Sequence, residues 1–136
     1  MDVQIAGFPQ NQFLQKVTIL SGASASEMIA LQGMAVIGLF TPTNGWTAAN
    51  IGFKTCWNGR DIDLVNTYND AGTLEQCIVS GDASGASIAI LFPSPDAIFA
   101  PFLQLTSVAV ASPQVTTAAP QGADRVIYLL LRRYLS

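Results

Sequence analysis

The chain has 136 residues and a formal net charge of −3, and only 11% of its residues are charged although 50% are hydrophobic. A domain commonly has about 150 residues, so this length predicts one domain. The absence of histidine excludes catalytic arrangements with a histidine base and metal sites with histidine ligands. The acidic balance argues against nucleic-acid binding, because phosphate contacts need a basic patch.

Short apolar or alternating runs, separated by turn residues, dominate the chain. Each run has about 4–8 residues, is rich in β-branched and aromatic side chains, and is bounded by Gly, Pro, Asn or Asp, as β-strands are. In chain order the runs are 15–20, 34–40, 51–57, 62–65, 73–79, 86–91, 102–108 and 126–131. This spacing predicts an all-β fold, with a single antiparallel β-sandwich over residues 1–136.

The run 51–57 also predicts an orientation, because successive side chains of a strand point to opposite faces. One face carries Ile51, Phe53, Thr55 and Trp57, and the other carries Gly52, Lys54 and Cys56. If Ile51 and Phe53 point to the core, Lys54 faces solvent or a partner. The Asn58-Gly59 pair that follows predicts a hairpin turn, since both residues tolerate positive φ.

Three segments depart from the strand pattern. A short helix is predicted over residues 44–50, because the side chain of Thr43 or Asn44 can accept hydrogen bonds from the first turn. Residues 111–123 are mostly small or polar and offer little to bury, which predicts a polar arm or a long loop. Residues 1–14 are predicted to form an extended N-terminal segment for the same reason.

Cys56 and Cys77 have two readings. Buried, reduced thiols are favoured, since cysteine is among the most buried residue types, and a disulfide is the alternative in an oxidising compartment. The first residues lack the positive and apolar regions of a secretory signal, which predicts synthesis in a cytoplasm unless the chain was processed. The longest apolar stretch, 28–40, is shorter than the ~20 residues of a membrane span. No membrane association is therefore expected.

One acidic cluster is a candidate metal site. Asp61, Asp63 and Asp70 lie among asparagines, and calcium takes six to eight oxygen ligands. The cluster lacks the spacing of an EF-hand loop, and two of its members flank Ile62 as in a half-exposed strand. A solvated hairpin is the favoured interpretation, so no metal and no other cofactor are expected.

Three aromatic residues are candidates for a platform that stacks against sugar rings: Trp46, Trp57 and Tyr68. Such platforms occur in carbohydrate-binding modules with a β-sandwich fold. Packing in the core and at the ends of the sandwich is the favoured interpretation of these side chains. A carbohydrate-binding module therefore stays the alternative function.

The low charge is itself informative. Soluble monomers rely on surface charge to stay apart, whereas obligate interfaces are depleted in Lys, Glu and Asp at their centre. Extended termini and a polar arm can add to the sheet edges of neighbouring chains. The composition thus predicts a non-enzymatic protein that works by assembly, as a homo-oligomer such as a dimer or on another chain.

Two segments carry a resemblance to a known family. Residues 42–53 resemble a Pro-x-x-x-Trp-Thr-Ala-Ala turn that leads into a strand in small structural proteins of tailed bacteriophages. There an Asp-Gly or Asn-Gly hairpin follows, which is Asn58-Gly59 in this chain, and residues 123–130 are similar to the final strand. Length, composition and strand pattern resemble the jelly-roll cement proteins, which decorate phage capsids. The match covers about residues 40–90 and the last strand.

The resemblance implies a jelly-roll protein on the outer capsid surface of a virion. Its partner would be the major capsid protein, and it would stabilise the shell by bridging neighbouring subunits through many weak contacts that add. A tail or fibre component of the virion is an alternative. Expected exposure then selects the contact residues, which are Phe8, Phe13, Thr116, Gln121, Arg132 and Arg133.

Overall fold

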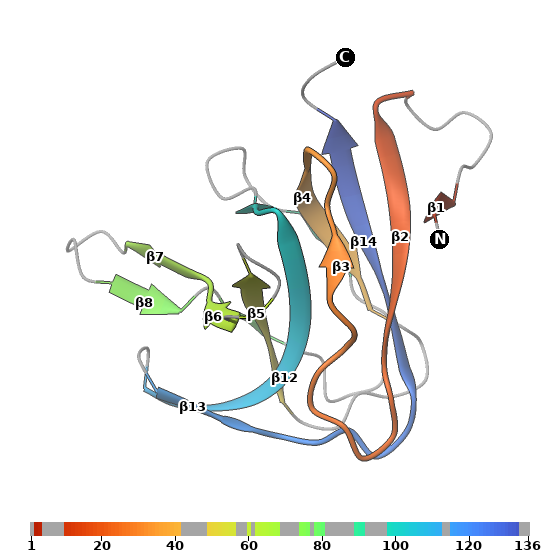
Figure 1. Ribbon diagram of the computed structural model, residues 1–136. Coiled ribbons are helices and arrows are strands. Elements are labelled where there is room, and N and C mark those ends of the chain that lie inside the picture. The colour runs from red at the N-terminus through yellow and green to blue at the C-terminus, as the bar shows by residue number, and fades with distance from the viewer. Residues whose placement is uncertain are drawn as a thin grey trace.

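In the part of the chain that the computed structural model describes, every element is a strand (Figure 1). It describes residues 2–3, 10–41, 49–56, 60, 62–68, 74–76, 78–80, 89–91, 98–112 and 115–133. Within these residues the strands form two six-stranded sheets and a separate two-stranded one, and every strand pair is antiparallel. The predicted all-β, antiparallel fold is confirmed for this part of the chain.

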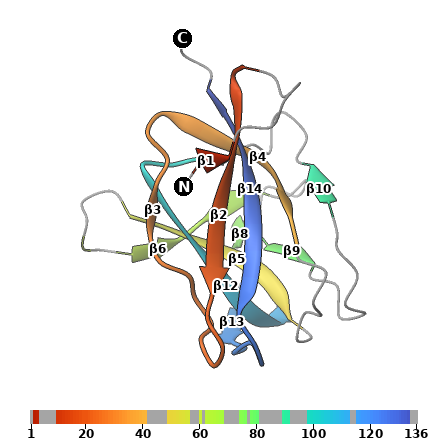
Figure 2. The same ribbon diagram turned by 90° about the vertical axis from the view of Figure 1, so that its right-hand side faces the viewer.

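The first sheet, which we call sheet A, is built around the last strand. Its order is β1 (Asp2–Val3), β2 (Gln12–Ile19), β14 (Arg125–Arg133), β4 (Met34–Phe40) and β10 (Ala89–Leu91), and β11 (Ile98–Phe99) also pairs with β4. Figure 2 shows β14 running beside β2. Leu129 lies opposite Gln15 on one side and Leu39 on the other, so β14 is paired along both edges.

The second sheet, sheet B, is built around the longest strand. Its order is β13 (Val115–Ala118), β12 (Phe102–Ser112), β5 (Asn50–Cys56) and β6 (Ile62–Leu64), and β3 (Ile29–Ala30) pairs with β12 while β9 (Ile78–Ser80) pairs with β5. The separate pair is β7 (Asn66–Tyr68) with β8 (Leu74–Gln76). Because β12 has eleven residues, it contacts β5 along its first half and β13 along its second.

The hydrophobic core lies between the two sheets. Sheet A contributes Val17, Ile19, Val36, Leu39, Ile127, Leu129 and Leu131, and sheet B contributes Ile51, Phe53, Leu103 and Leu105. These side chains are at most 1% exposed, and burying one aliphatic side chain of this size contributes about 1.5–3 kcal/mol. The predicted inward face of the run 51–57 is therefore confirmed for Ile51 and Phe53.

The predicted loop segments are partly strand. Residues 111–112 continue β12 and residues 115–118 form β13, so the predicted arm over 111–123 is corrected to a paired hairpin followed by a connection. Residues 12–14 of the predicted N-terminal segment belong to β2. The predicted helix over 44–50 lies outside the described residues apart from its last two positions, and Asn50 begins β5.

A tight turn carries the chain from sheet B to sheet A. The backbone N–H of Met34 donates to the carbonyl of Leu31 at 3.0 Å, and the two residues between them, Gln32 and Gly33, have φ of 54° and 80°. Positive φ at both central positions is the type I′ geometry. The turn thus links β3 to β4 at the edge of the core.

Candidate functional site

Three of the predicted contact residues lie near the end of β14, since Phe13 on β2 is opposite Leu131. The guanidinium carbon of Arg133 lies 5.1 Å from the centre of the Phe13 ring, and the Arg133 N–H donates to the carbonyl of Asn11 at 2.9 Å. Arg132 is exposed and points to the other face, because neighbouring residues of a strand alternate. We call Phe13, Arg132 and Arg133 the arginine end. It presents one cation on each face of sheet A.

The other three predicted contact residues lie elsewhere. Thr116 is on β13, at the opposite end of the sandwich from the arginine end in both views (Figures 1 and 2). Gln121 is only 1% exposed, so its expected exposure is wrong. Phe8 lies outside the described residues.

Gln121 is buried because hydrogen bonds satisfy its amide. Its Oε1 accepts from Arg125 Nε at 3.1 Å, and its Nε2 donates to Ser107 Oγ at 2.8 Å. Ser107 Oγ donates in turn to the carbonyl of Ala119 at 2.6 Å. Arg125 itself is only 8% exposed. This network joins β12, β14 and the connection between β13 and β14.

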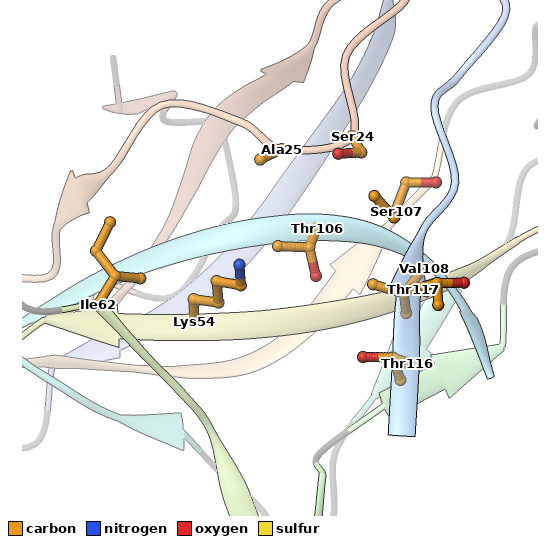
Figure 3. Close-up of a pocket in the computed structure, with 10 residues that line it drawn as sticks. Ser24, Ala25, Lys54, Ile62, Thr106, Ser107, Val108, Thr116 and Thr117 are labelled. Atoms are coloured by element: carbon orange, nitrogen blue, oxygen red, sulfur yellow. The ribbon is translucent and has the colours of Figure 1, made fainter. Parts of the chain in front are cut away.

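A pocket of about 290 Å³ lies on sheet B. It is on the face turned away from the core, because Gly52 and Lys54 alternate along β5 with the buried Ile51 and Phe53. Figure 3 shows the residues around it. Its polar lining consists of Ser24, Lys54, Thr106, Ser107, Thr116 and Thr117, and small or branched apolar side chains complete it.

Thr106 is unusual among the pocket residues. It is 4% exposed, and its Oγ1 is the single buried side-chain oxygen or nitrogen in the described part of the chain without a hydrogen-bond partner. The hydroxyl lies over Gly52, where an added Cβ would be 2.7 Å from it. Other buried hydroxyls are satisfied. Ser26 Oγ, for example, donates to the carbonyl of Glu27 and accepts from the N–H of Leu105.

Cys56 is 3% exposed and forms no disulfide with another cysteine in the described part of the chain. The predicted burial is confirmed for this residue, although it shares the outer face of β5 with Lys54, and its reduced state stays a prediction. Strands flank it on both sides, with Ile62 opposite it on β6 and Phe102 opposite it on β12. Cys77 lies outside the described residues.

The remaining sequence candidates are only partly described. Outside the described residues lie Trp46, Trp57, Asp61 and Asp70. Tyr68 is the last residue of β7, and Asp63 is the central residue of β6. Within the described residues no group of three or more His, Cys, Asp or Glu side chains is arranged to hold a metal ion. The sugar platform stays a prediction.

No helix in the described ranges is long and apolar enough to cross a membrane.

Comparison of the chain with protein-family models, with curated proteins and with solved structures gives no match. The features of this molecule that bear on function are therefore its two separated ends and the pocket on sheet B.

Proposed function

We propose that the chain is a non-enzymatic virion protein that binds the outer surface of a tailed-phage capsid and bridges neighbouring major capsid subunits. The supporting observation is that the arginine end and Thr116 lie at opposite ends of one sandwich (Figure 1). The strand β14 has nine residues, and at about 3.3 Å per residue it extends over about 30 Å. Contacts separated by such a length reach two different subunits.

The jelly-roll topology is part of this proposal and is supported by the strand order. We number eight of the described strands, β2, β3, β4, β5, β9, β10, β12 and β14, from one to eight. Sheet A then has the order 1-8-3-6 and sheet B the order 2-7-4-5. Two intertwined Greek keys produce this order, and many viral capsid domains have the jelly-roll architecture.

The charge-poor composition of the chain supports bridging as the mode of action. A cement protein works by holding two shell subunits together, so it needs contact area and no reacting groups. Among the described strands, β13 lies at the edge of sheet B, and an edge strand can accept a strand or arm of a neighbouring chain. Each contact can be weak, because repetition over many equivalent sites adds the contacts together.

Binding to purified shells of the phage that encodes the chain tests the proposal. We expect saturable cosedimentation with hundreds of copies per shell, and a higher temperature of shell disruption when the protein is bound. Absence of binding to the shell contradicts the proposal. A handful of copies on the complete virion, at the tail alone, contradicts it in favour of a tail or fibre component.

A pair of matched variants tests the arginine end. Arg132→Ser and Lys16→Ser each remove one exposed positive charge from sheet A, but Lys16 lies near the middle of β2, opposite Tyr128. If the arginine end contacts the shell, Arg132→Ser weakens binding by about tenfold, which corresponds to about 1.4 kcal/mol. Lys16→Ser leaves binding within twofold. If the two variants weaken shell binding equally, binding depends only on the overall charge of the protein, and the arginine end is not a specific contact.

A further inference from the structure

We propose that the pocket on the outer face of sheet B binds a small organic monocarboxylate. This inference goes beyond capsid binding and does not depend on it. Lys54, Thr106 and Thr117 supply the polar groups, and they come from β5, β12 and β13. Figure 3 shows the Lys54 amino group and the Thr106 side chain on the same side of the paired strands β5 and β12.

Charge selects a monoanion. Among the described residues that line the pocket there is one cation, Lys54, and no acidic side chain, although the chain as a whole has a net charge of −3. Lys54 is half-buried, so its attraction for an anion is less screened than that of a fully exposed lysine. One positive charge balances a carboxylate, whereas a phosphate monoester carries a charge of about −1.5 to −2 at pH 7 and inorganic phosphate is partly a dianion there.

The unpartnered hydroxyl of Thr106 points to a ligand that accepts a hydrogen bond. On the same strand the neighbouring Ser107 hydroxyl both donates and accepts, and on β5 Thr55 Oγ1 donates to the carbonyl of Phe102 at 2.8 Å. Valine has the same shape as threonine, yet the chain carries a buried hydroxyl at position 106 that lacks a partner, at a cost of about 1–3 kcal/mol. Rotation about the Cα–Cβ bond turns this hydroxyl between staggered positions, and a carboxylate oxygen accepts its proton.

Size and apolar lining define the rest of the ligand. A pocket of about 290 Å³ holds the volume of about ten water molecules, which suits a short-chain acid. Ile62 and Val108 line it beside the polar groups, and Ile62 is 51% exposed. A short hydrocarbon chain would cover part of that surface. No aromatic side chain is among the lining residues in the described part of the chain, so stacking on a sugar ring is not favoured.

Titration of the isotope-labelled full chain with butyrate, followed by amide chemical shifts, tests the proposal. We expect saturable shifts at residues 24–25, 106–108 and 116–118. Butyramide, which has the same shape without the charge, binds at least tenfold more weakly, and inorganic phosphate binds more weakly than butyrate. The proposal is overturned if butyrate gives no saturable shift, if butyramide binds equally well, or if phosphate binds as tightly.

Matched variants separate the pocket from general charge effects. Lys54→Met keeps the side-chain stem and is expected to weaken butyrate binding at least tenfold, whereas Lys16→Met on sheet A leaves it unchanged. Thr106→Val is expected to weaken binding severalfold without loss of stability, whereas Thr18→Val leaves binding unchanged. Retained binding by a folded Lys54→Met protein, or equal loss in both lysine variants, refutes the proposal. If Lys54→Met does not fold, Thr106→Val and the butyramide comparison decide.

Discussion

Replacing Gln121 by methionine tests whether the buried hydrogen-bond network holds the two sheets together. The variant removes the bond that the Gln121 amide accepts from Arg125 and the bond that it donates to Ser107. Methionine has a similar volume, so the loss of the polar groups dominates. A hydrogen bond to a charged group contributes about 1.5–3 kcal/mol and a neutral one about 1 kcal/mol. We therefore expect the free energy of unfolding to fall by about 3 kcal/mol.

Urea denaturation measures this loss, and Gln104→Met is the matched control. Gln104 Nε2 donates one neutral hydrogen bond, to the carbonyl of Ser26 at 2.8 Å, so its replacement costs about 1 kcal/mol. At about 2.1 cal/mol/K per residue, the entropy of unfolding predicts that Gln121→Met lowers Tm by about 10 °C. The reasoning is refuted if Gln121→Met costs no more than Gln104→Met. It is also refuted if Gln121→Met and Arg125→Met are additive within about 0.5 kcal/mol, because coupled residues are not additive.

Three further outcomes are expected. Gly52→Ala destabilises the protein by about 1–3 kcal/mol in urea titrations, because its Cβ would lie 2.7 Å from Thr106 Oγ1. Most of this loss disappears in a Thr106→Ala background, and an equal loss in both backgrounds contradicts the steric cause. Gln32→Asn raises the free energy of unfolding by about 0.5 kcal/mol, because asparagine tolerates the positive φ at this position better than glutamine does; an unchanged midpoint contradicts this. Iodoacetamide leaves Cys56 unmodified in the native protein, because the thiol is 3% exposed, and modifies it after denaturation; native modification, detected by mass spectrometry, contradicts its burial.

The sequence predicts strands well where burial and local turn chemistry agree. The run 34–40 coincides with β4, because Gly33 ends the preceding turn and the apolar residues of the run face the core. The predicted run 126–131 lies within β14, because its apolar residues also face the core. Alternation also identifies the inward face of β5 before its partners are known.

Short strands at the edges escape prediction, because their pairing is decided by distant partners. β13 has only four residues, and although three of them are β-branched, the run is too short and its surroundings too polar to predict a strand. It forms because β12 continues beyond residue 108 and offers a partner edge, with Ala109 opposite Thr117. The pocket on sheet B cannot be predicted from the sequence either, because the residues that line it are far apart in the chain.

Gln121 shows why a charge-poor composition does not by itself locate a contact surface. A neutral polar side chain in a polar segment is expected at the surface, yet Gln121 and Ser107 are buried because each completes the hydrogen bonds of the other. Part of the neutral polar content therefore belongs to the interior, where it holds the sheets in register. Only residues that stay exposed after this correction, such as Arg132 and Thr117, can serve neighbouring chains. Variants at these positions are consequently more informative about assembly than changes in overall charge.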